Sequence, residues 1–113
     1  MAGINIIKIK HLPSMPADDT YVANSVVGER YLIGTFRRES EKHGLYYETV
    51  VLDGATLNFD DSSARAVTSA AYYGSLKHAK KTHKRCARET AQRIKDGLLD
   101  GRSMTQARAN DGT

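Results

Sequence analysis

The sequence predicts an α+β fold in which a small antiparallel β-sheet of three to four strands is packed by one long C-terminal amphipathic helix. Residues before position 54 form short runs of β-branched and aromatic side chains, separated by polar or glycine-containing turns. Residues 72–98 instead carry apolar side chains three or four positions apart, which is the spacing of one helix face. A sheet of this size must cover one face, and this helix is the segment long enough to do so.

The first expected strand is Ile4–Lys10, whose alternating pattern sends lysines to solvent. A loop over 11–19 follows, because both of its prolines lack the N–H that a sheet requires. Tyr21–Val27 and Tyr31–Arg37 then form an antiparallel pair, with Gly28 supplying a positive φ at the turn. Leu45–Asp53 is the strongest strand, and its core side is expected to be Leu45, Tyr47, Thr49 and Val51.

The long helix follows a loop at 60–63. We expect it to be capped by Thr68 or Ser69, with Ala64 to Val67 as a short extended piece, in preference to Ser62 or Ser63. It should end near Asp96 and Gly97. Residues 1–97 would then form a single domain, and 98–113 would be a C-terminal arm or tail with a short helical turn at 103–109. The apolar stripe of the helix is expected to contain Tyr72, Leu76, Ala79, His83, Cys86, Ala87, Thr90, Ile94 and Leu98.

Length, charge and cysteine content limit the class of protein. The chain has 113 residues, a formal net charge of +4 and one cysteine, so it suits one domain without an intramolecular disulfide. No apolar run approaches the roughly 20 residues that span a bilayer, and the N-terminus lacks the pattern of a secretory signal. We therefore expect a protein of the cytoplasm that has no membrane partner.

Cations are concentrated in one part of the helix. Those that could contact nucleic acid are Lys77, Lys80, Lys81, Lys84, Arg85 and Arg88, and Arg37 and Arg38 could extend the patch. The simplest interpretation is the solvated side of a helix that rests on a sheet. The alternative is a ridge that faces phosphates, and such binding would be largely non-specific because base-reading residues at a helix-turn-helix spacing are missing.

His78, His83 and Cys86 raise the question of a metal site. His83 and Cys86 share a helix face, but His78 points elsewhere, so a four-ligand zinc site would need a coincidence. We expect His83 to face the core with one nitrogen bonded to backbone, and Cys86 to be buried and inert. The sequence also lacks the common catalytic motifs. We therefore predict no metal, no cofactor, no catalytic residue and no enzyme activity.

One combination of features resembles a known group. The strand segment Tyr47, Glu48, Thr49, Val50 and Val51 is followed by a Thr or Ser cap at 68 or 69 and by a helix that bears His78. Over about residues 45 to 80 this pattern is similar to small accessory proteins encoded by tailed bacteriophages. The resemblance implies an α+β fold in a phage setting, with host-cell cytoplasm as the location, and it assigns no catalytic residues.

The function we expect is that of a non-enzymatic protein-interaction factor, such as a bacteriophage accessory protein that binds a host or virion protein. The sequence leaves open whether the protein forms a homo-oligomer. The second hypothesis is a non-specific nucleic-acid-binding protein that uses the basic face of the helix. The two hypotheses differ in salt dependence, because phosphate contacts weaken steeply as ionic strength rises.

Overall fold

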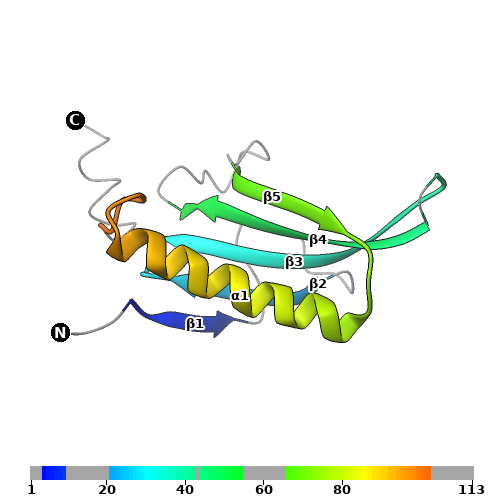
Figure 1. Cartoon of the computed structure of the whole chain (residues 1–113), viewed down its shortest axis with the longest axis horizontal. Helices are drawn as coiled ribbons and strands as arrows, with labels where there is room; N and C mark the ends of the chain where they lie inside the picture. Colours follow the sequence, from blue (N-terminus) through cyan, green and yellow to red (C-terminus); the bar gives the residue numbers. More distant parts are fainter. Residues whose placement is uncertain (1–3, 10–20, 43, 55–65, 103–113) are drawn as a thin grey trace.

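The computed structural model describes residues 4–9, 21–42, 44–54 and 66–102. Within these ranges, five strands form one antiparallel sheet and a helix follows them (Figure 1). The strands are β1 (Ile6–Ile9), β2 (Tyr21–Val27), β3 (Tyr31–Ser40), β4 (Gly44–Asp53) and β5 (Ala66–Tyr72), and the helix is α1 (Leu76–Lys95). Strand order follows the sequence, β1-β2-β3-β4-β5. The predicted α+β class is confirmed, although the sheet has five strands rather than three to four.

The predicted strands correspond to β1 through β4. β2 has the expected bounds, and β3 continues past Arg37 to Ser40. The turn between these two strands has φ of 61° at Gly28 and 60° at Glu29. A Cβ atom on Gly28 would also lie 3.0 Å from the side chain of Ile94, so backbone conformation and packing both favour glycine there. The loops predicted at 11–19 and 60–63 lie outside the described residues.

β5 corrects the predicted start of the helix. Residues 66–72 pair antiparallel with β4, so neither Thr68 nor Ser69 is a helix cap and Tyr72 belongs to a strand. The helix begins at Leu76, where the side chain of Ser75 accepts a hydrogen bond from the backbone N–H of His78 at 3.1 Å. Pairing with a neighbouring strand has here overridden the local preference of an alanine-containing segment.

The predicted end of α1 is confirmed. The last helical residue is Lys95, Asp96 is the C-cap, and Gly97 has φ of 75°. The backbone N–H of Gly97 donates to the carbonyl of Ile94 at 3.1 Å, and that of Leu98 donates to Arg93 at 2.9 Å. Glycine in this left-handed conformation lets the chain satisfy the last helical carbonyls as it turns away.

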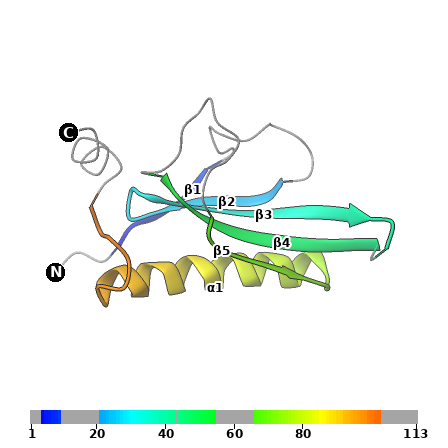
Figure 2. The ribbon, with the colours of Figure 1, turned by 90° about the horizontal axis from the view of Figure 1, so that it is seen from above.

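The core lies between α1 and one face of the sheet (Figure 2). Its main cluster consists of Val27, Tyr31, Ile33, Val51, Ala87 and Ile94. The helix buries Ala79, His83, Ala87, Thr90 and Ile94. Leu76 and Leu98 are instead 48% and 72% exposed, so the prediction was wrong at both ends of the apolar stripe. On β4, Tyr47, Thr49 and Val51 are buried as predicted, but Leu45 is exposed. The opposite face is buried too, at Val50 and Leu52.

The residues just after α1 contact the sheet. Leu99 packs against the core cluster, and the hydroxyl of Tyr31 donates to the carbonyl oxygen of Asp100 at 2.9 Å. Arg30 forms a two-point hydrogen-bonded pair with Asp53, at 2.9 and 2.8 Å, and its Nη1 lies 3.0 Å from a carboxylate oxygen of Asp100. These contacts join the β2–β3 turn, the end of β4 and the chain after the helix. Residues 103–113, with their predicted helical turn, lie outside the described part.

Within the described ranges, no helix has the length and apolar character needed to cross a membrane.

Candidate functional site

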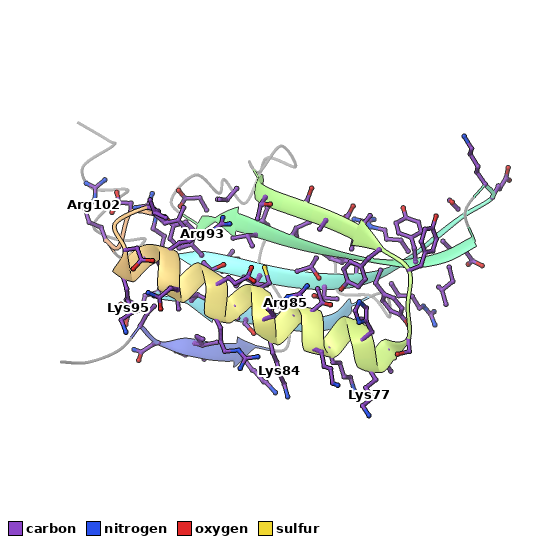
Figure 3. The ribbon with its side chains drawn as sticks, viewed as in Figure 1. Lys77, Lys84, Arg85, Arg93, Lys95 and Arg102 are labelled. Atoms are coloured by element: carbon purple, nitrogen blue, oxygen red, sulfur yellow. The ribbon has the colours of Figure 1, made fainter. Side chains whose placement is uncertain are left out.

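The cations of α1 are divided between two flanks of the helix. Because the buried positions face the sheet, helical spacing places one group of cations on the side of β1. Figure 3 shows Lys77, Lys84 and Lys95 on that side and Arg93 on the side of β4 and β5. Arg85 lines a cavity together with residues of β5. We call the first group the cationic flank, and all its members are exposed: Lys77, Lys80, Lys81, Lys84, Arg88 and Lys95.

Arg85 lies on the β5 side of α1, apart from the other five residues of the predicted nucleic-acid surface. Its Nε atom lies 4.0 Å from Glu89, which is four positions further along the same flank. Both side chains are more than 60% exposed, so this ion pair contributes little to stability. Glu89 is the one carboxylate between Leu76 and Lys95 in the sequence, and it lies away from the cationic flank. The cationic flank of the helix therefore carries no acidic side chain.

Two adjoining cavities lie between the cationic flank and the β1–β2 edge of the sheet. We call them together the β1–α1 groove. One has a volume of about 320 Å³ and the other about 460 Å³, and they share Lys8, His83 and Lys84. Their other lining residues are Ile6, Val22, Ala23, Asn24, Ser25, Lys80, Ala87 and Arg88. Among the lining residues that the structure describes there is no carboxylate, and Lys8 from the sheet faces helix cations across this groove.

A buried hydrogen-bond chain lies beside the groove. The Nε2 atom of His83 is 2.8 Å from Ser25 Oγ, and its Nδ1 atom is 2.9 Å from Thr35 Oγ1. Thr35 Oγ1 lies 2.8 Å from Thr49 Oγ1, which lies 2.9 Å from the hydroxyl of Tyr72. A neutral imidazole has one donor and one acceptor, so all protons of this chain can point in one direction. His83 is thus buried as predicted, but its partners are side chains rather than backbone.

The environment of His83 favours the neutral imidazole. Burial, and secondly the charge of Lys8, lower the pKa of His83 from 6.5 to about 4. A base of that pKa is weakly suited to remove the proton of Ser25 at neutral pH, and its second nitrogen contacts a threonine hydroxyl instead of a carboxylate. The Ser25–His83 pair is therefore best explained as a structural connection between β2 and α1.

The opposite side of α1 has a smaller cavity. It measures about 160 Å³ and is lined from β5 by Thr68, Ser69 and Ala70, and from the helix by residues that include Arg85, Cys86 and Glu89. Burial is the main reason that the pKa of the Cys86 thiol is raised, so little reactive thiolate forms at neutral pH. Among the residues that the structure describes, no group of three His, Cys, Asp or Glu side chains could hold a metal ion.

The two arginines that could have extended the basic surface belong to β3. Arg38 contacts Glu48 at 3.3 Å, and its guanidinium lies over the ring of Phe36 at 5.0 Å. Arg37 is exposed and pairs in register with Tyr47. Neither lines the β1–α1 groove. The sequence prediction instead missed Lys8, for which the only signal was its place in an alternating strand.

No family model, no curated protein and no solved structure matches this chain. The function is therefore inferred from the arrangement of its own residues.

Proposed function

We propose that this protein binds nucleic acid without sequence specificity, through the cationic flank of α1. The observation that carries the proposal is the sorting of Lys77, Lys80, Lys81, Lys84, Arg88 and Lys95 onto one exposed side of the helix that has no carboxylate. A solvated helix face that serves only to keep a protein soluble usually mixes charges of both signs. A row of one sign instead attracts a polyanion.

The dimensions of the cationic flank suit a row of phosphates. Lys77 and Lys95 are eighteen positions apart, which corresponds to about 27 Å along a helix. A nucleic-acid duplex presents roughly eight base pairs over that length at about 3.4 Å per step. Lysines on flexible stems can follow such a backbone without contacting base edges, which supports binding that positions phosphates and does not read sequence.

A salt series with paired variants tests this function. Fluorescence anisotropy of a labelled 20-nucleotide oligomer would be measured at several salt concentrations, with the strand single or in a duplex. If three to six phosphates are contacted, the logarithm of the affinity should fall against that of the salt concentration with a slope of about −3 to −5 for the duplex and about −2 to −4 for the single strand. Lys77→Gln with Lys81→Gln should weaken binding about tenfold or more and make the duplex slope shallower by nearly 2.

The matched control removes two positive charges elsewhere. Lys42 in the β3–β4 turn and Arg93 on the β5 side of α1 are both exposed. Lys42→Gln with Arg93→Gln changes the net charge equally, and we expect a much smaller loss of affinity. Equal losses in the two double variants would show attraction by overall charge alone, and no binding below about 10 µM at low salt would rule out the proposed function.

A second candidate is the protein-interaction role, such as a phage accessory factor that binds a host or virion protein. It is favoured by apolar exposure where β4 begins and β5 ends: Leu45 is 52% exposed and Tyr73 is 62% exposed. The rings of Tyr46 and Tyr73 meet edge to face there, with centroids 6.4 Å apart. Affinity purification from phage-infected cells should recover a partner that Leu45→Ser and Tyr73→Ser together release, and capture unaffected by both changes would contradict this candidate.

A further inference from the structure

The β1–α1 groove brings cations from two elements together. Lys8 projects from β1, and its register partner on β2 is Ser25, whose hydroxyl contacts His83 of the helix. Lys8 therefore lies on the helix side of the sheet, which agrees with the lowering of the pKa of His83 by its charge. Lys84 and Arg88 line the same cavity from the helix.

This lining concentrates positive charge. The two cavities contain Lys8, Lys80, Lys84 and Arg88, and His83 between them favours its neutral form. A cleft lined by charges of one sign focuses the electric field and attracts ions of the opposite sign. A phosphate group in the groove would lie near several of these cations at once, so the groove suits an anionic ligand.

The shape of the groove selects the form of nucleic acid. A duplex can lie along the convex outer side of α1, where Lys77 and Lys81 project. It is too broad to enter cavities of about 320 and 460 Å³ between a helix and a strand. One strand of backbone is thin enough, and the exposed apolar side chain of Ile6 in the lining offers contact to an unstacked base or sugar.

We propose that the β1–α1 groove binds single-stranded nucleic acid, with Lys8, Lys84 and Arg88 contacting its phosphates. This inference rests on the proposed function and names its preferred ligand. A single strand contacts both the groove and the cationic flank, whereas a duplex contacts the flank alone. The protein therefore binds a single strand more tightly than a duplex of the same length.

The test compares Lys8→Gln with Lys81→Gln on two ligands, a labelled 20-nucleotide oligo-dT and a 20-base-pair duplex, at one low salt concentration. Each variant removes one lysine charge from an exposed side chain, and circular dichroism would verify that both keep the native fold. The unaltered chain should bind the single strand about tenfold more tightly than the duplex. Lys8→Gln should weaken single-strand binding about fivefold and leave duplex binding unchanged, whereas Lys81→Gln should weaken both alike.

Chemical shifts supply a readout that does not depend on a variant. Titration of the unaltered protein with unlabelled oligo-dT should move the backbone amide signals of Ser25, Lys84 and Ala87 more than those of Arg85 and Glu89. Equal affinity for the two ligands, or equal effects of the two variants on the single strand, would overturn the groove as the site while nucleic-acid binding itself stood. Failure of both ligands to bind would overturn the proposed function together with this inference.

Discussion

The imidazole of His83 contacts the hydroxyl of Ser25 at 2.8 Å and so joins the middle of α1 to β2 through a buried polar contact. On its other side the same ring contacts Thr35 of β3, which continues to Thr49 of β4 and to the hydroxyl of Tyr72 on β5. One helical side chain is thereby connected, through hydroxyl groups, to four adjacent strands. An apolar residue at position 83 would leave these polar groups without their partner, which costs more than a simple loss of packing.

Replacement of His83 should therefore destabilise the fold. We expect His83→Ala to lower the free energy of unfolding by about 2–4 kcal/mol, because it leaves a cavity and two hydroxyls without their imidazole partner. His78→Ala is the matched control, since His78 is exposed, and it should cost less than about 1 kcal/mol. Urea unfolding followed by circular dichroism measures both, and similar losses would contradict the structural role of the buried ring.

Acid should weaken the fold through the same residue. The pKa of His83 is about 4 in the folded chain against 6.5 ordinarily, so between these values the unfolded state binds the proton more strongly. The stability that depends on the neutral ring is complete above pH 6.5 and is lost as the pH falls toward 4, by up to about 3 kcal/mol.

The pH measurement compares the unaltered chain with His83→Gln, so that the titration of other groups largely cancels. The difference in free energy of unfolding between the two proteins should shrink by about 2–3 kcal/mol from pH 7.5 to pH 4.5. Parallel pH profiles would show that His83 is protonated equally easily in both states. The imidazole signals in NMR would report the same titration directly.

The Arg30–Asp53 ion pair should also stabilise the fold. Arg30 is 7% exposed and makes two hydrogen bonds to Asp53, and these are the main reason that its pKa is raised. Arg30→Met removes both of these hydrogen bonds to the buried end of β4 and should cost about 2–3 kcal/mol. Arg37→Met, at an exposed position of the next strand, should change stability by less than about 0.5 kcal/mol. Thermal unfolding at pH 7 compares the two, and equal melting temperatures would argue against the pair.

Ser75 gives a prediction for the helix boundary. Ser75→Ala removes the acceptor for the His78 amide and should cost about 1 kcal/mol. Ser75→Asp keeps an acceptor and adds negative charge beside a first turn that has no acidic residue, so it should match or exceed the stability of the unaltered chain. If both variants unfold at the same urea concentration as the unaltered chain, the helix does not depend on this cap.

Much of the fold could be read from local pattern. Alternating or β-branched runs predicted β1 through β4, and the spacing of Ala79, His83, Ala87 and Ile94 predicted the buried side of α1. These predictions succeed because side-chain direction repeats every two residues in a strand and about every 3.6 in a helix. β5 was missed because Ala66–Tyr72 has no clear alternation and forms a strand only through its pairing with β4.

The sequence by itself determined the α+β class, the end of the helix at Asp96 and Gly97, and the placement of lysines on an exposed side of α1. The tertiary structure alone decided that Arg85 lies on the β5 side of α1, away from the cationic flank, and that Lys8 and Lys84 line the same groove. It also chose Ser25 and Thr35 as the partners of His83. The physical reason is that periodicity is a local property, which shows only the side of its own strand or helix on which a residue lies. Contacts between elements depend instead on how the helix packs against strands that are distant in the sequence.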